Sequence, residues 1–216
     1  MCIRDREMSE WANEFVYGGC PANGYAQMSI TLQAKAYGAK ATFFMAKRSM
    51  DNLHEYQKKA LEYGADIRWV PNGMLQVTKK RALDYYNEDP VNRRLLQLGL
   101  DDNRVREDIR DLAKTIETDY NINISEVWSV GSSGTLTRGL QMAFPDKDVH
   151  VVSVGHTMAQ YEVGRAILHR SHLKFTQEVK EEDMPPFPSV PTYDANAWKI
   201  MREQAKPGSL FWNVGK

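Results

Sequence analysis

The segment from Val127 to Gln141 constrains the fold more than any other part of the chain. It starts with an apolar run that alternates with small polar residues, which predicts a buried strand. A turn of two glycines and two serines follows, and from Thr135 the spacing of the apolar residues is helical. A strand that ends at small residues and continues as a helix leaves several backbone N–H groups pointing into one hollow. The positive end of the helix lies there too, so the hollow suits a phosphate.

The residues of this turn are the candidate phosphate ligands: Gly131, Ser132, Ser133, Gly134 and Thr135. Glycine and serine keep side-chain bulk away from a ligand, and the hydroxyl groups add donors. The same turn also occurs as a plain connection in α/β domains, where glycine only permits a positive φ. The glycine spacing is not G-x-G-x-x-G and no Gly-Lys-Ser/Thr follows, which excludes a P-loop. We therefore expect a small terminal phosphate, on a cofactor or a sugar.

Composition narrows the class of protein. The 216 residues allow one large domain or two small ones, and 28 basic residues balance 28 acidic ones. This balance gives no electrostatic reason to expect nucleic acid or an anionic membrane as a partner. The two cysteines, Cys2 and Cys20, provide no disulfide framework, and no apolar run approaches the length of a membrane span. The sequence therefore predicts a cytoplasmic protein.

The first residues do not fit the rest of the chain. Residues 1–6 do not continue the pattern of strands and helices that follows them. They resemble the spurious leader that sequencing-adapter readthrough leaves on assembled environmental sequences. We treat residues 1–13 as a leader and expect the natural protein to begin further upstream.

Strands and helices alternate after this leader. Short apolar runs predict the strands, and helical spacing predicts the segments between them. The predicted strands include residues 14–17, 41–45, 66–70, 149–154 and 209–214; the predicted helices include 25–37, 51–63, 74–86, 105–118 and 195–205. Residues 87–105 are expected to form a polar connection. This order indicates an α/β fold of two open, mostly parallel sheets flanked by helices, with lobes at 14–118 and 119–216.

Three segments in this order resemble the fold-type II pyridoxal-phosphate-dependent enzymes, the tryptophan synthase β-like superfamily. The first is the glycine-rich turn from Val130 to Thr137, and the second is the loop and helix from Gly18 through Gln27 to Thr42. The third combines Pro191–Ala195 with Leu210–Gly215. The chain is most similar to the branch of D-cysteine desulfhydrase and 1-aminocyclopropane-1-carboxylate deaminase. The resemblance covers residues 14–216 and implies the cofactor pyridoxal 5'-phosphate.

The resemblance also implies roles for individual residues. The turn would hold the cofactor phosphate, and the loop with the helix start would bind the substrate carboxylate. The residues of that second site are Cys20, Asn23, Gly24 and Gln27. Tyr193 would lie beside the cofactor ring and move protons at the substrate carbons, although a core tyrosine fits the sequence equally well. Asn213 would contact the pyridine nitrogen if the register differs from the family by one residue.

The chain departs from the family pattern at three places. The lysine that forms the Schiff base with the cofactor precedes the carboxylate loop in this family, a position that falls before Met1 here. Lys35, Lys40 and Lys47 do not replace it convincingly. Val214 stands where the branch has a threonine that faces the pyridine nitrogen, and Asn196 stands where relatives often have lysine. The particular reaction is therefore less defined than the cofactor.

Other signals are weaker. The His169–His172 pair has the H-x-x-H spacing of metal ligands, but a solvated helix face explains it better, and no metal site is expected. A wet helix surface also explains the arginines that alternate with acids: Arg93, Arg94, Arg104, Arg106 and Arg110. His156 follows a predicted strand at its carboxyl end, where ligands gather in open α/β sheets.

Two functions remain open at this stage. The first is a pyridoxal-phosphate-dependent lyase or deaminase that acts on a small amino acid, with the Schiff-base lysine segment absent from this chain. The second is a non-catalytic module of the same fold that binds a phosphate or an amino acid. A Rossmann-like nucleotide domain has the wrong glycine spacing. The relatives suggest a homodimer.

Overall fold

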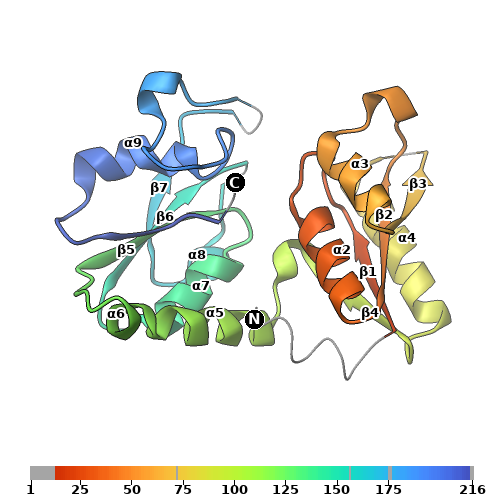
Figure 1. Cartoon of the computed structure of the whole chain (residues 1–216), viewed down its shortest axis with the longest axis horizontal. Helices are drawn as coiled ribbons and strands as arrows, with labels where there is room; N and C mark the ends of the chain where they lie inside the picture. Colours follow the sequence, from red (N-terminus) through yellow and green to blue (C-terminus); the bar gives the residue numbers. More distant parts are fainter. Residues whose placement is uncertain (1–12, 72, 156, 175–176, 215–216) are drawn as a thin grey trace. The chain divides into compact units, whose positions relative to one another are not determined.

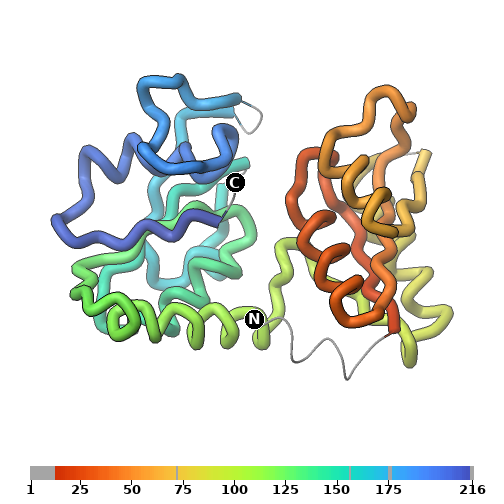
Figure 2. Tube along the Cα trace, viewed as in Figure 1, coloured from red at the N-terminus to blue at the C-terminus, as the bar shows by residue number. Residues whose placement is uncertain are grey.

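The computed structural model describes residues 13–71, 73–155, 157–174 and 177–214. The expected leader, apart from Asn13, and His156 lie outside these ranges. The chain divides into two compact units, Met1–Leu100 and Asp101–Lys216, each with its own sheet. Figure 2 follows the trace through the first unit in red to yellow-green and through the second in green to blue. Among the described helices, none combines the length and the apolar composition needed to cross a membrane.

The first unit contains a four-stranded parallel sheet with the order β3-β2-β1-β4. Its strands are β1 (Glu14–Gly18), β2 (Lys40–Ala46), β3 (Asp66–Val70) and β4 (Arg93–Leu96). Strand β1 lies in the middle and is buried along its whole length, which explains its apolar sequence. The parallel order requires a crossover between successive strands, and helices provide it (Figure 1).

Helices cover both faces of this sheet. They are α2 (Ala26–Ala36), α3 (Glu55–Glu62) and α4 (Leu75–Glu88), with short 3₁₀ turns at Met50–Asn52 and Leu98–Leu100. Met28 of α2 and Ala60 of α3 pack with Phe15 and Phe43 in one core cluster. Ala82 and Tyr85 of α4 pack with Val16 and Phe44 in another. Neighbouring strand residues point to opposite faces, so the two clusters lie on opposite sides of the sheet.

The second unit repeats this plan with the strand order β7-β6-β5-β8, again all parallel. Its strands are β5 (Glu126–Gly131), β6 (Asp148–Ser153), β7 (Ile167–Arg170) and β8 (Leu210–Trp212). Its helices are α5 (Asn103–Lys114), α6 (Ile116–Asp119), α7 (Thr135–Ala143), α8 (Gln160–Val163) and α9 (Ala195–Gln204), with a 3₁₀ turn at Glu181–Asp183. Helices α5 and α7 pack on one face of β5, around Val127, and α9 packs on the other, around Trp128. The predicted α/β class with two parallel sheets is confirmed.

Three local predictions were wrong. The segment 87–105, expected to be a connection, contains strand β4. Helix α5 was assigned to the first lobe, but it packs on α7 in the second unit. The boundary between the two units lies between Leu100 and Asp101. His169, expected on a solvated helix face, lies on strand β7 and is half-buried. Both missed strands have four residues at a sheet edge, too short to show the alternation that identifies a strand.

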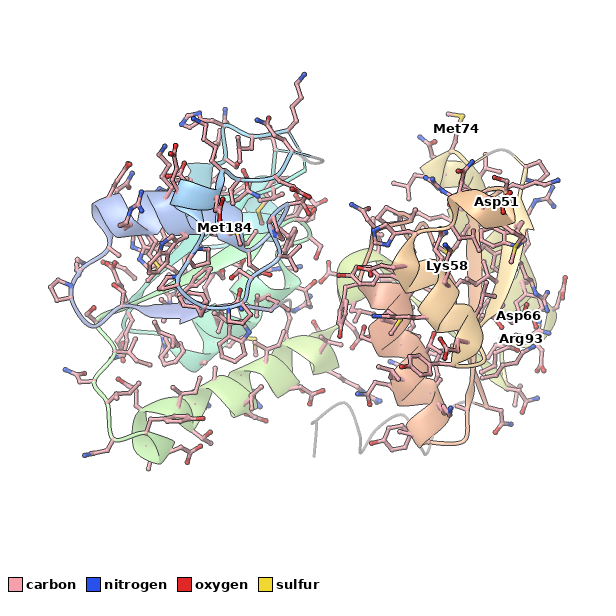
Figure 3. The ribbon with its side chains drawn as sticks, turned by 45° about the horizontal axis from the view of Figure 1, so that its top comes forward. Asp51, Lys58, Asp66, Met74, Arg93 and Met184 are labelled. Atoms are coloured by element: carbon pink, nitrogen blue, oxygen red, sulfur yellow. The ribbon has the colours of Figure 1, made fainter. Side chains whose placement is uncertain are left out.

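Arg93 does not belong to a wet helix surface, because it starts β4 and binds Glu14, the first residue of β1. The Nε atom of Arg93 lies 3.2 Å from Glu14 Oε2, and Tyr85 donates a hydrogen bond of 3.1 Å to Glu14 Oε1. Thr42 also donates to this carboxylate. The cluster lies at the amino ends of the strands, where Figure 3 marks Asp66 and Arg93. Charged residues at this edge therefore connect strands that are far apart in sequence.

Candidate functional site

The glycine-rich turn has the predicted strand-turn-helix geometry. Strand β5 ends at Gly131, and α7 begins at Thr135 after a left-handed residue, Gly134, with φ of 74°. The N–H of Arg138 donates to Gly134 O at 2.9 Å, and this is a first-turn bond of the helix. The preceding N–H groups of the helix start have no acceptor within the helix. They point from the positive end of α7 into the turn, which is the arrangement that binds a phosphate.

Both glycines of the turn are needed for packing within the chain. A Cβ at Gly134 would lie 1.9 Å from the carbonyl oxygen of Glu162, and one at Gly131 would lie 2.7 Å from Val151 Cγ2. From the sequence, we expect these glycines to leave room for a ligand. The structure adds a second reason, since the turn lies directly against α8 and β6.

Hydroxyl groups line the same helix start. Ser133 Oγ and Thr135 Oγ1 are 3.2 Å apart, and Ser132 and Ser133 are half-buried. Thr137 is fully buried, and its Oγ1 has no hydrogen-bond partner among the described residues. A buried hydroxyl without a partner is costly unless a ligand or water completes it. Thr137 was not among the predicted ligands, although its place in the first helical turn, two residues after Thr135, was a usable signal.

Arg138 fixes the turn from the side of the helix. Its guanidinium donates to the carbonyl oxygens of Gly134 at 3.3 Å and Ser133 at 3.4 Å. It also forms an ion pair of 2.7 Å with Asp101, which Arg106 binds as well. Arg138 therefore holds two carbonyl groups of the turn in place. Sequence reasoning missed this role, because Asp101 is 37 residues away.

In the first unit, the predicted carboxylate loop follows β1 and leads into α2. Gln27 is fully buried, and its amide nitrogen donates to Ala22 O at 2.7 Å and Gly24 O at 2.9 Å. The Cys20 thiol donates to Gly24 O at 3.8 Å. Burial raises the pKa of Cys20 to about 12, so the group is a neutral thiol near pH 7. Both side chains therefore hold the shape of the loop.

Asn23 and Gly24 of this loop are half-buried, as is Ala22, and Pro21 is exposed. Tyr25, the N-cap of α2, forms no side-chain hydrogen bond to the helix start. The N–H groups there lack the capping oxygen that Ser, Thr, Asp or Asn would supply. An anion such as a carboxylate is a suitable acceptor for them.

Tyr193 and Asn213 lie in the second unit. Tyr193 packs with Trp128 and Val152 in the core cluster on the α9 face. Burial and the charge of Asp194 raise the pKa of Tyr193, so the phenol is protonated at neutral pH. The Asn213 amide donates to Pro188 O at 2.8 Å and accepts from Ser189 Oγ at 2.7 Å. Asn213 thus connects the end of the last strand to Pro188 and Ser189.

The three lysines considered as replacements for the Schiff-base lysine have other surroundings. Lys40 Nζ lies 3.3 Å from Asp66 and 3.7 Å from Glu14, at the amino edge of the first sheet. Lys35 Nζ lies over the Tyr63 ring at 5.7 Å, and Lys47 is exposed after β2. The candidate ligand loops follow the carboxyl ends of β1 and β5, so Lys40 is at the opposite edge of its sheet.

Comparison with known proteins gives structural matches. A crystal structure of an ACC deaminase homologue has a TM-score of 0.79 at 14% sequence identity, over 99% of this chain and 78% of that chain. A fungal L-serine ammonia-lyase from Rhizomucor miehei has a TM-score of 0.54 at 16% identity, over 74% and 49%. A serine racemase from Dictyostelium discoideum has a TM-score of 0.55 at 11% identity, over 71% and 48%. No protein-family model and no curated protein sequence matches the chain.

These matches define the class of fold. Two parallel sheets with helices on both faces form the fold of the fold-type II pyridoxal-phosphate-dependent enzymes, and this chain has that fold. The chain spans about half the length of the ammonia-lyase and the racemase and more of the deaminase homologue. The residues at the α7 start suit a cofactor phosphate, because the turn provides N–H groups and Thr137 provides a buried hydroxyl without a partner.

Proposed function

We propose that this chain provides the cofactor-phosphate and substrate-carboxylate sites of a pyridoxal-phosphate-dependent lyase or deaminase that acts on a small amino acid. The observation that carries the proposal is the turn between β5 and α7, with its N–H groups, its hydroxyl groups and the unpartnered Thr137 Oγ1. The fold shared with the ACC deaminase homologue and the L-serine ammonia-lyase supports it.

The residues of the chain would have separate tasks. The turn from Gly131 to Thr135 would bind the phosphate, and Arg138 would keep its carbonyl groups turned away. The loop at Asn23 and Gly24 would orient the substrate by its carboxylate. When bound, pyridoxal phosphate withdraws electrons from the substrate amino acid and thereby weakens bonds at its α-carbon.

Tyr193 would act as a proton donor to a substrate carbon. A phenol with a raised pKa keeps its proton at neutral pH, which suits an acid better than a base. Asn213 would contact the pyridine nitrogen only after releasing Pro188 or Ser189. Its first task in the proposal is therefore to position the last strand.

We propose a Schiff-base lysine at a position before Met1, where the family resemblance places it. The surroundings of Lys40, with Glu14 and Asp66 at the other edge of the sheet, favour the same position. They also keep the second function open, in which the fold binds a phosphate or an amino acid without catalysis.

Binding to the chain tests the phosphate site directly. Isothermal titration calorimetry with pyridoxal 5'-phosphate and with pyridoxal should show binding that depends on the phosphate. The loss of charge-assisted hydrogen bonds worth about 1.5–3 kcal/mol predicts an affinity for pyridoxal lower by about tenfold or more. Thr137→Val should weaken binding of the phosphate form, and Thr118→Val, at an exposed position of α6, should not. Equal affinities for both compounds would refute the phosphate site.

A test of the reaction uses a protein that carries the proposed lysine segment before Met1. After incubation with the cofactor and reduction with borohydride, peptide mass mapping should locate the cofactor on an upstream lysine. Release of ammonia or a keto acid from small amino acids would then support the lyase or deaminase. Binding of pyridoxal phosphate with no labelled lysine would support the non-catalytic module instead.

A further inference from the structure

Three potential metal ligands lie together at the amino ends of β5 and β6. Glu126 and Asp148 are the first residues of these strands, and His150 follows two residues into β6. One ligand atom from each side chain lies within 4.8 Å of the others. Strand β5 has six residues, each with a rise of about 3.3 Å, and the glycine-rich turn follows its carboxyl end. The cluster therefore lies at the opposite edge of the sheet from this turn.

The His150 ring is held in a fixed orientation. It stacks on Trp128 with a centroid distance of 4.2 Å and an interplanar angle of 11°. Its Nδ1 lies 2.9 Å from His169 Nε2, and the His169 ring stacks on Trp128 as well, at 4.7 Å. Metal-bound histidines are typically oriented in this way, by a hydrogen bond from the nitrogen that does not bind the metal.

The other nitrogen of this ring lacks a partner. His150 Nε2 is buried and forms no hydrogen bond within the described part of the chain, although Glu126 Oε2 is 3.5 Å away. A cation between His150 Nε2 and Glu126 Oε2 would bind both atoms and so give this nitrogen a partner.

The two oxygens of the Glu126 carboxylate have different partners. Oε1 accepts hydrogen bonds from Trp128 Nε1 at 2.7 Å, the Lys206 backbone N–H at 2.9 Å and Ser209 Oγ at 2.9 Å. These bonds orient the buried side chain and leave Oε2 directed toward His150 and the Lys206 ammonium.

The ammonium of Lys206 is the positive charge next to the Glu126 and Asp148 carboxylates. Its Nζ lies 3.3 Å from Glu126 Oε2 and 3.1 Å from Asp148 Oδ2, and the Lys206 side chain is 59% exposed. A long exposed side chain moves into solvent at little cost, whereas the buried Glu126 and the stacked His150 remain in place. Asp148 is also exposed.

We propose that Glu126, Asp148 and His150 form a zinc site whose ion replaces the Lys206 ammonium. The distance of 3.5 Å between Glu126 Oε2 and His150 Nε2 matches two corners of a zinc tetrahedron, which are roughly 3.4 Å apart for bonds of about 2.1 Å. A mixed imidazole and carboxylate set suits zinc, whereas magnesium and calcium prefer oxygen ligands. The ion would join the starts of two central strands and so act structurally.

Zinc titration of the full chain by calorimetry tests the site, with Zn²⁺ alone as the probe and Mg²⁺ as a comparison. We expect one zinc ion per chain and no comparable Mg²⁺ signal. Asp148→Asn should lower the affinity at least about tenfold, the size of effect that losing even an outer-shell partner produces. Asp146→Asn, at another exposed aspartate before β6, is the matched control and should bind as the unmodified chain does.

Lys206→Met provides a test in the opposite direction. It removes the competing ammonium but keeps the backbone N–H that holds Glu126 Oε1. We expect tighter zinc binding, a gain that a poorly folded variant would not produce. Zinc affinities that are the same for Asp148→Asn, Asp146→Asn and the unmodified chain would overturn the proposal, as would weaker binding by Lys206→Met.

Discussion

The α-carbon of Gly134 lies so close to the carbonyl group of Glu162 that a Cβ would come within 1.9 Å of its oxygen. Gly134 also has φ of 74°, a conformation in which residues with a Cβ are strained. The turn from Gly131 to Thr135 and helix α8 therefore define each other's positions through one glycine. A sequence pattern predicts the turn, but only the fold shows what the turn packs against.

Gly134→Ala should both destabilise the second unit and reduce phosphate binding. The backbone conformation alone costs about 1–2 kcal/mol for alanine, and the collision with Glu162 forces the turn to move. Thermal unfolding and calorimetry with pyridoxal 5'-phosphate measure the two effects. Gly38→Ala is the matched control, because Gly38 has φ of 68° with no atom within 4 Å of its Cβ position. Equal effects of the two substitutions on phosphate binding would contradict the prediction.

Arg138→Met should weaken phosphate binding while the melting temperature changes little. The ion pair between Arg138 and Asp101 is partly exposed, and such pairs contribute about 0–1 kcal/mol to stability. The guanidinium also holds the carbonyl groups of Ser133 and Gly134, so its loss releases the turn and removes a nearby positive charge. Calorimetry with inorganic phosphate measures the change. Arg110→Met, at a half-buried arginine of α5 that pairs with Asp111, should leave the affinity unchanged.

The sequence was informative where structure depends on neighbouring residues. The strand, the turn and the helix start between Val127 and Thr137 follow from local pattern, so their existence and the candidate ligands could be predicted. Strand β4 could not, since its Arg93 binds Glu14, which is 79 residues away in sequence.

Roles within the site were harder to predict than its location. Cys20 and Gln27 stand at the expected loop, but their partners are carbonyl groups of the loop itself. His169 has the spacing of a metal ligand with His172, whereas the fold places it against His150 on the next strand. Such pairs arise from strand register, which depends on how distant segments align.

Cys20 should react slowly with thiol reagents in the folded chain. Its pKa rises from an ordinary value of 9.0 to about 12 through burial, which reduces the thiolate fraction near pH 8 about a thousandfold. In a Cys2→Ser background, absorbance with a disulfide reagent should show negligible labelling until urea unfolds the chain. Cys20→Ser, which retains Cys2, tests the reagent on the other cysteine. Rapid labelling of the native Cys2→Ser protein would mean that Cys20 is accessible and that the loop is open.

Protonation of Glu14 should make the first unit less stable in acid. Burial alone would raise the pKa of its carboxyl, but the hydrogen bond from Thr42, the charge of Lys40 and the contacts with Tyr85 and Arg93 together lower it below the ordinary value of 4.5. A group with a lowered pKa stabilises the folded state above the unfolded pKa, and this contribution is lost as the pH falls through the folded pKa. Urea unfolding from pH 7 down to pH 3 should therefore show a decline that begins near pH 4.5.

Glu14→Gln isolates this contribution. The substitution removes the Glu14 carboxylate from Arg93, which keeps its contact of 3.4 Å with Glu88. It should cost about 1–3 kcal/mol at pH 7, with a smaller loss toward pH 3. Glu203→Gln, at an exposed position of α9, should retain both the stability and the pH profile of the unmodified chain. If Glu14→Gln and the unmodified chain lose stability in parallel between pH 5 and pH 3, Glu14 is not the group responsible.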